Sequence, residues 1–172
     1  MIDRLADPRA ACGAILAAAS ATIGGALLFE HGLGLVPCKL CLLQRDPYYL
    51  AMAVAAIGIY LRPGRGSRAA LAVLALTFLV SAALGLYHSG VEWGWWLGPS
   101  DCGGGTGQAA ESVGDFMKSL ETTRVVSCTE AAWRFLGLSL AGWNVVISLA
   151  LTAFAVLSLG RRQGSSSVSQ YR

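Results

Sequence analysis

Apolar residues gather along the chain in long uncharged runs that short polar segments separate. Residues 10–29 and 69–87 contain no charged side chain, and each run reaches the roughly 20 residues that a membrane-spanning helix needs. Residues 135–160 are also uncharged, and their most apolar part extends from 143 to 159. The pattern therefore predicts three membrane-spanning helices.

A fourth apolar segment, residues 48–61, is shorter. Its fourteen residues would rise about 21 Å as a helix, against a hydrocarbon core of about 30 Å. A start at residue 38 gives enough length: Pro37 then suits the helix start, while Pro47 kinks the helix. The alternative is a short helix that Asp46 caps and Pro47 begins. We favour the longer helix because it can cross the membrane.

These helices predict an all-α membrane protein, a four-transmembrane-helix bundle with two outward-facing loops that forms one membrane domain over residues 1–172. The expected elements are helices near 10–29, 38–61, 69–87 and 138–159, outer loops at 30–37 and 88–134, an inner loop at 62–68, and a tail at 160–172. The serine-rich tail is expected to be disordered. Apolar side chains recur at helical spacing within residues 109–121. They predict a short amphipathic helix, which either lies on the membrane or packs on its own loop.

Composition and charge support this topology. Hydrophobic residues make up 55% of the chain and charged residues 13%, against about 25% charged residues in an ordinary soluble domain. Eight of the thirteen basic residues, but only two of the ten acidic ones, lie in the N-terminus, the inner loop and the tail. The positive-inside rule therefore predicts that both termini are cytoplasmic and that the two long connections face outward. Because topology explains the net charge of +3, we expect a lipid bilayer and no nucleic acid as partner.

Two pairs of cysteines lie in the connections that this topology places outside. Cys38 and Cys41 have the Cys-x-x-Cys spacing of small, readily exchanged disulfides. Cys102 and Cys128 are farther apart, in the long outer loop. Because disulfides persist on the oxidising side of a membrane, the two pairs suggest a relay for electrons. The fifth cysteine, Cys12, is expected to be a small buried hydrophobic residue.

Two polar residues are candidates for a role in redox chemistry beside the first cysteine pair. Arg45 follows Cys41 by four residues, so on a helix its cation lies on the same face and can stabilise a thiolate or an anion on a bound electron acceptor. His88 ends the third helix at a similar depth, where it can bond a quinone carbonyl or supply a proton. A purely structural role is the alternative for His88, and His31 has the same ambiguity.

Other cysteine chemistries fit the pattern less well. A c-type haem site needs histidine directly after the second cysteine, where this chain has Leu42. A four-cysteine zinc site needs a second close pair, and no histidine lies between Cys102 and Cys128. We therefore expect no metal. A metal-handling membrane protein and a structural protein with inert disulfides remain the alternatives to a redox enzyme.

Taken together, the motifs resemble the DsbB family, bacterial inner-membrane thiol:quinone oxidoreductases that reoxidise the periplasmic dithiol oxidase DsbA. The resemblance covers nearly the whole chain, through residues 29–31, 37–45, 86–88, 102 and 128–138. Its most specific part is Cys-x-Leu-Cys-x-x-Gln-Arg. Vitamin K epoxide reductases use similar logic, but they carry their cysteine pairs in the reverse order.

The resemblance implies a multi-pass protein of the bacterial inner membrane whose redox loops face the periplasm. It implies a DsbA-like dithiol oxidase as partner and a quinone, ubiquinone or menaquinone, as cofactor. It also implies a Cys102–Cys128 disulfide, which the reduced partner attacks at Cys102. Cys128 then attacks Cys38.

The same resemblance implies that Cys41 is left as a thiolate that faces the quinone. Arg45 would hold this thiolate and the quinone head group together, and His88 would line the pocket. All four outward cysteines are thus expected to be catalytic, and Arg45, Cys41 and His88 to bind the cofactor.

Overall fold

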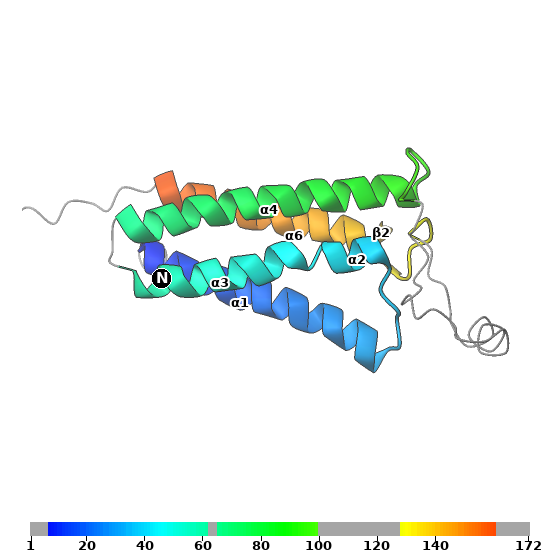
Figure 1. Cartoon of the computed structure of the whole chain (residues 1–172), viewed down its shortest axis with the longest axis horizontal. Coiled ribbons are helices and arrows are strands. Elements are labelled where there is room, and N and C mark those ends of the chain that lie inside the picture. The colour runs from blue at the N-terminus through cyan, green and yellow to red at the C-terminus, as the bar shows by residue number, and fades with distance from the viewer. Residues whose placement is uncertain (1–6, 62–64, 100–127, 161–172) are drawn as a thin grey trace, which may run out of the picture.

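Helices make up most of the computed structural model, which describes residues 7–61, 65–99 and 128–160. In chain order the elements are α1 (Pro8–Leu27), the π-helix η2 (Leu28–Gly32), α2 (Lys39–Leu43), α3 (Asp46–Tyr60), α4 (Arg65–Glu92), β1 (Arg134–Phe135), β2 (Leu138–Ser139) and α6 (Leu140–Gly160). The long helices run side by side, and α2 continues the line of α3 (Figure 1).

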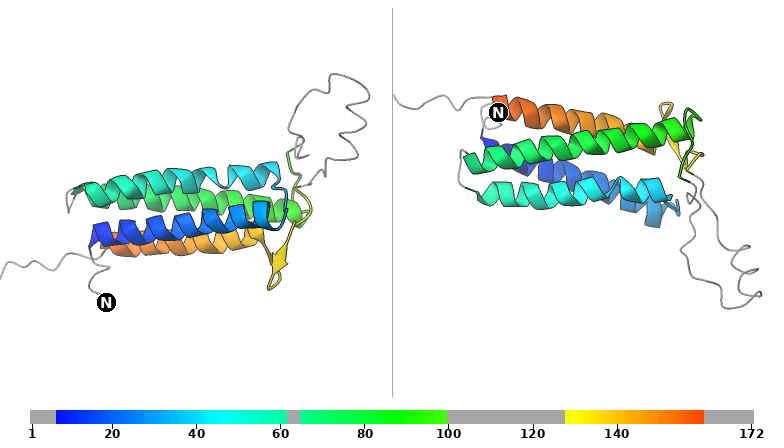
Figure 2. Two further views of the ribbon diagram at one scale, coloured as in Figure 1. Left: turned by 90° about the horizontal axis from the view of Figure 1, so that it is seen from below. Right: turned by 45° about the horizontal axis from the view of Figure 1, so that its top comes forward.

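The helices form a bundle in which α4 lies between two neighbours. It packs most extensively on α6 and also packs on α3, while α1 packs chiefly on α3. Figure 2 shows the same arrangement from two further directions. At one end of the bundle α1 finishes, α2 begins, α4 finishes and α6 begins, so residues far apart in the sequence meet there.

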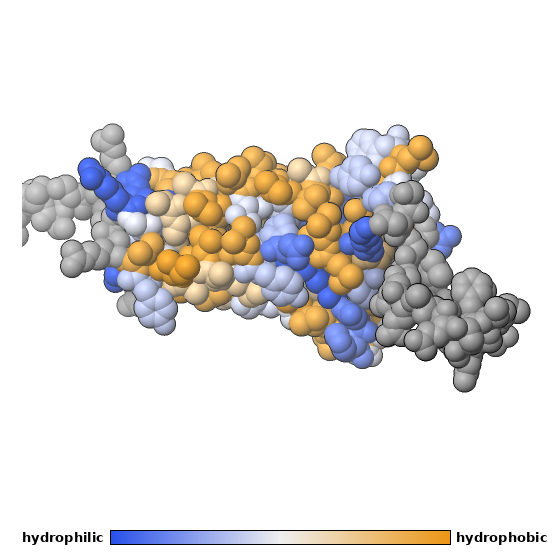
Figure 3. Space-filling model, viewed as in Figure 1, coloured by the Kyte–Doolittle hydropathy of each residue, from blue (hydrophilic) through white to orange (hydrophobic). Residues whose placement is uncertain are grey.

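Three helical segments are long and apolar enough to cross a membrane: Pro8–Gly32, Arg65–Glu92 and Leu140–Gly160. Large apolar side chains on them are exposed on the outside of the bundle, among them Leu76, Leu79 and Leu149. The space-filling view accordingly shows a mostly apolar surface along the helices (Figure 3). The structure thus confirms the predicted helical class with three candidate spans; a crossing by α3, which has only 15 residues, stays a prediction.

The helix expected over residues 38–61 is divided in two. Cys38 is the N-cap of α2, and its sulfur accepts a hydrogen bond from the Cys41 N–H at 3.2 Å. The first segment ends at Leu43, four residues before Pro47, which has no N–H to bond the Leu43 carbonyl and whose ring would clash with it. A new helix begins at Asp46. Helix starts therefore occur near both positions considered from the sequence, but Asp46 is the first residue of the second helix and not its cap: the N-cap is Arg45, and it makes no side-chain cap hydrogen bond.

Small side chains allow the helices to approach closely. The buried residues at the helix contacts include many alanines: Ala11, Ala19, Ala51, Ala55, Ala70, Ala75, Ala82 and Ala155. Small residues are favoured at such contacts in membranes because they let backbones come together. Larger side chains fill the middle of the core, where the Tyr48 and Phe78 rings pack edge to face at 5.5 Å.

Hydrogen bonds from arginines close the end of the bundle opposite the cysteines. Arg9 Nε donates to the Leu61 carbonyl at 2.8 Å, and Arg68 Nη2 donates to the Leu159 carbonyl at 2.8 Å. Both carbonyls lie at helix C-termini, where cations are favourable. The basic residues thus have a local structural role in addition to the orientation that their distribution predicts.

A short hairpin leads the chain into α6 at the cysteine end. Strands β1 and β2 pair antiparallel through Arg134 and Ser139, and both turn residues, Leu136 and Gly137, have positive φ, as tight two-residue hairpin turns require. The Ser139 hydroxyl accepts the Gly142 N–H at 3.2 Å, which caps the start of α6. This arrangement fixes the segment that follows Cys128 against the bundle.

Several sequence predictions lie outside the described residues. They concern Cys102, the amphipathic helix within 109–121, the first residues of the inner loop (62–64) and most of the tail. Three boundaries differ within the described part. The η2 turn continues to Gly32, inside the expected outer loop. Helix α4 begins at Arg65, inside the expected inner loop, and extends to Glu92, so His88 lies inside the helix, one turn before its end.

Gly85 offers a test of the packing between α4 and α6. A methyl group on Gly85 would lie 2.9 Å from Val145 Cγ2 and 3.2 Å from the Ala141 carbonyl oxygen. Such overpacking costs about 1–3 kcal/mol, so Gly85→Ala is expected to lower the unfolding free energy of the protein in detergent.

The matched control is Gly24→Ala on α1, where an added methyl group meets nothing within 4 Å. There the gain in helix propensity of roughly 0.5–1 kcal/mol should dominate. Equal stability of the two variants in thermal unfolding would contradict the packing described for Gly85.

Candidate redox site

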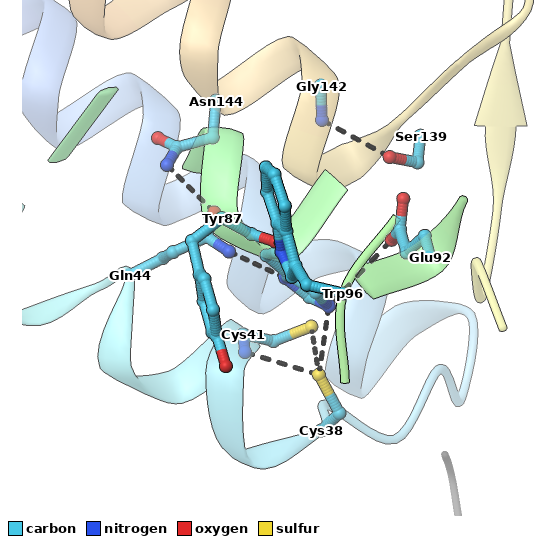
Figure 4. Close-up of polar contacts among 10 residues, drawn as sticks. Cys38, Cys41, Gln44, Tyr87, Glu92, Trp96, Ser139, Gly142 and Asn144 are labelled. Atoms are coloured by element: carbon cyan, nitrogen blue, oxygen red, sulfur yellow. Dashed lines mark hydrogen bonds and ion pairs between the residues drawn. The ribbon is translucent and has the colours of Figure 1, made fainter. Parts of the chain in front are cut away.

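The Cys-x-x-Cys pair sits at the first turn of α2. The Sγ atoms of Cys38 and Cys41 lie 2.9 Å apart and are not bonded to each other. Cys38 is buried, whereas Cys41 is partly exposed. Figure 4 shows the two sulfur atoms facing one another. A disulfide of about 2.05 Å can form here with little movement of the backbone.

Cys128 lies directly against this pair. It is 1% exposed and belongs to a buried cluster with Cys38, Leu40 and Val91, against which Cys41 also packs. Cys128 is disulfide-bonded, and its expected partner, Cys102, lies outside the described residues. The structure thus brings together three of the four cysteines that the sequence predicted to be catalytic.

His88 contacts the pair from α4. Its Nε2 lies 3.5 Å from Cys38 Sγ, and its Nδ1 lies 2.6 Å from Gln44 Nε2. An amide nitrogen can only donate, so Nδ1 is the acceptor and Nε2 carries the hydrogen in the neutral ring. His88 therefore presents an N–H to Cys38, a contact that the sequence did not predict.

A chain of hydrogen-bonded polar side chains fixes the His88 ring on its Nδ1 side. Asn144 Nδ2 donates to Gln44 Oε1 at 2.8 Å, and Tyr48 donates to Asn144 Oδ1 at 2.7 Å. The chain continues through Ser148 to Ser81. Because each donor in this network is already assigned, the Gln44 amide cannot turn over without losing a bond, and the orientation of the ring is set.

Glu92 ends α4 one turn after His88. Its Oε1 lies 3.8 Å from His88 Nε2, and its side chain is 4% exposed. Among the described residues its second oxygen, Oε2, has no hydrogen-bond partner. Sequence reasoning missed Glu92, although its spacing of four residues from His88 on a helix was visible.

Arg45 forms an ion pair within the site. It lies in the turn between α2 and α3, and its Nη1 donates to Glu30 Oε2 at 2.6 Å. Glu30 belongs to η2, and π-helical turns occur frequently at functional sites. The side chains of Arg45 and Glu30 are 13% and 27% exposed. The sequence predicted the cation but not its partner.

A cavity of about 470 Å³ opens beside the pair. Three predicted cofactor-binding residues, Cys41, Arg45 and His88, line it together. Its apolar wall includes the aromatic side chains Phe29, Tyr48, Trp133, Phe135 and Trp143. Its size and composition, apolar with a few polar groups, are typical of pockets for small organic ligands.

The environment of Cys38 favours its thiolate. The residue precedes α2, at the outer end of the bundle. The contact with the Cys41 side chain contributes most to lowering the pKa of the Cys38 thiol from 9.0 to about 4, and the hydrogen bond from His88 contributes as well. Burial acts in the opposite direction. In the reduced pair the negative charge is thus expected on Cys38.

The remaining candidates have other surroundings. Cys38, Cys41 and His88 place ligand atoms within 4.8 Å of one another, but a structural zinc ion takes four ligands, and no fourth described residue joins this group. His31 is exposed and contacts the Leu27 carbonyl of its own helical turn. Cys12 is buried in the core of the bundle.

Comparison with known proteins identifies the family. The family "Disulfide bond formation protein DsbB" matches residues 8–158. Disulfide bond formation protein B of Marinobacter nauticus is 30% identical over 158 residues, which are 87% of this chain and 90% of the relative. The protein of the same name from Methylococcus capsulatus is 32% identical over 154 residues, 85% and 86% of the two chains.

A third relative, Disulfide bond formation protein B of Aromatoleum aromaticum, is 27% identical over 158 residues, 87% of this chain and 91% of its own. No solved structure matches the chain significantly. Because the family match covers most of the sequence and the helices are long and apolar enough to cross a membrane, this chain belongs to the DsbB family and is a multi-pass membrane protein.

Proposed function

We propose that this membrane-embedded oxidoreductase of disulfide formation takes electrons from a periplasmic DsbA-like dithiol oxidase and passes them to membrane quinone. One observation carries the proposal. Cys38 is buried in one cluster with the disulfide-bonded Cys128, Cys41 packs against this cluster, and Cys41 also lines the apolar cavity. The pair therefore adjoins both a disulfide-bonded cysteine and a pocket for an organic ligand.

The exchange proceeds through sulfur atoms. The partner's thiolate attacks Cys102, and the Cys102–Cys128 bond breaks to leave Cys128 as a thiolate. Cys128 attacks Cys38, the Cys38–Cys41 bond breaks, and Cys41 becomes the thiolate. The partner's second thiol then breaks its mixed disulfide with Cys102, and the partner leaves oxidised. The Cys102 thiolate attacks Cys128, which re-forms the Cys102–Cys128 bond and releases Cys38, so that the Cys38–Cys41 pair is reduced. Two electrons would then leave this pair through Cys41 as its disulfide re-forms.

The cavity suits a quinone. A quinone bound there would accept two electrons and two protons from the Cys38–Cys41 pair and would leave as quinol. Aromatic walls can stack on its ring, while Arg45 and His88 can bond its carbonyl oxygens at the polar end. The need for such an acceptor follows from energetics, because DsbA has a potential of about −120 mV and the periplasm is kept oxidising through DsbA, DsbB and quinone.

The orientation follows from charge. With both termini and the inner loop in the cytoplasm, the cysteine end of the bundle faces the periplasm, and a bacterial inner membrane surrounds the helices. Helix α3 then makes the fourth crossing together with α2, which extends it at the periplasmic surface.

Replacement of Cys102, the cysteine that the partner attacks, tests the route of the electrons. Cys102→Ser is expected to abolish quinone reduction by a reduced DsbA-like partner, because no disulfide remains for the partner to attack. Bound quinone should be unchanged, since Cys102 is far along the route from Cys41. The measurement is quinone absorbance during turnover, with Cys12→Ala as a control that keeps full activity. Full activity of Cys102→Ser would refute the proposal.

Replacement of Arg45 tests the quinone pocket. Arg45→Ala removes a charge-assisted hydrogen bond worth about 1.5–3 kcal/mol, so the apparent affinity for quinone should fall about 10-fold or more. Arg134→Ala, which removes an exposed cation from the hairpin, should leave the affinity unchanged. An apparent quinone affinity that is the same in Arg45→Ala and the unmodified protein would contradict the assigned role.

A further inference from the structure

Two protons accompany the two electrons that reduce a disulfide, and the structure suggests where one of them is held. We propose that Glu92 binds a proton whenever the Cys38–Cys41 pair is reduced and releases it when the disulfide re-forms. Glu92 would thus be a proton-binding residue of the site beside His88. The inference deepens the proposed function and rests on it only for the final acceptor.

The surroundings of Glu92 make a permanent negative charge unfavourable. The side chain is 4% exposed, and a buried carboxylate is costly unless it is paired and hydrogen-bonded. Among the described residues its ion-pair partner is His88, through Oε1, and Oε2 has no hydrogen-bond partner. The group is therefore sensitive to any new negative charge close to it.

Such a charge appears on Cys38 when the pair is reduced. The neutral ring of His88 has a single N–H, at Nε2, because Nδ1 accepts from Gln44. The Nε2 atom that carries this hydrogen lies 3.5 Å from Cys38 Sγ and 3.8 Å from Glu92 Oε1. One donor cannot stabilise two anions at once, so a thiolate at Cys38 and a carboxylate at Glu92 compete for the single His88 N–H.

The other described groups around Glu92 do not relieve this competition. Glu92 lies 3.8 Å from His88 of its own helix, and its charge opposes a thiolate at Cys41 of α2. Cys128, in the same buried cluster as the pair, is disulfide-bonded and does not titrate. Among the described residues the competition for the His88 N–H is therefore between Cys38 and Glu92.

Protons and electrons then balance at each step. When a dithiol reduces the pair, the Cys38–Cys41 bond breaks and two electrons and two protons arrive. Cys38 becomes a thiolate that accepts a hydrogen bond from the His88 N–H. The first proton binds Cys41, which becomes a thiol, and the second proton binds Glu92. When quinone reoxidises the pair, the bond re-forms, and the protons of Cys41 and Glu92 accompany the two electrons to give quinol.

The test measures protons rather than turnover. Full-length protein carrying Cys102→Ser and Cys128→Ser has one pair left, which is equilibrated with a thiol redox buffer at several pH values near neutrality. We expect the midpoint potential of this pair to change with pH at the slope of two protons per two electrons. In Glu92→Gln, which keeps size and shape, the slope should fall to half.

Controls separate the carboxylate from general effects. Glu130→Gln removes an exposed carboxylate on the same side of the bundle and should keep the full slope, and Glu92→Asp should restore it at least in part. In addition, the infrared difference spectrum between reduced and oxidised protein should show a protonated carboxyl band that Glu92→Gln lacks.

An unchanged slope in Glu92→Gln, or the absence of that band from the protein with Glu92 intact, would overturn the inference. Neither measurement needs quinone. If the unmodified protein fails to reduce quinone, the proposed function fails, whereas the proton measurement still decides the role of Glu92.

Discussion

The site depends on the imidazole of His88, because it joins three parts of the bundle through one ring. Cys38 contacts it from the start of α2, Gln44 holds its other nitrogen, and Glu92 approaches from the end of α4. Asn144 on α6 extends the connection through Gln44. A shift of any of these helices would change the hydrogen bond that Cys38 receives, so the packing of the bundle and the chemistry of the pair are coupled.

The break before Pro47 makes this geometry possible. A continuous helix would include Arg45 in its body, whereas the interruption leaves a turn between Leu43 and Asp46. It also places Arg45 in the turn, where it meets Glu30 of η2. Two irregular elements thus provide the charged end of the cavity, and a ligand that binds Arg45 must share it with the Glu30 carboxylate.

Sequence alone predicted the features that local patterns determine. The helical class, the candidate spans and a helix start at Cys38 follow from apolar run length and proline positions. Glu30, Gln44, Glu92 and Asn144 were not predicted as site residues, because their roles arise from contacts across the bundle; Gln44 and Asn144 are 100 positions apart. The division of the second helix was also missed, since both of its starts have good local signals.

The central claim is that Cys38 receives electrons from Cys128 and hands them to Cys41. The most direct measurement is disulfide mapping by mass spectrometry of the unmodified protein, without quinone, after exposure to a reduced partner that lacks its second thiol. That partner stays bonded to Cys102, so the released Cys128 thiolate should attack the Cys38–Cys41 bond, and peptides joined through Cys38 and Cys128 should accumulate while Cys41 becomes a free thiol. If Cys38 stays bonded to Cys41 while Cys128 is free, the account is wrong.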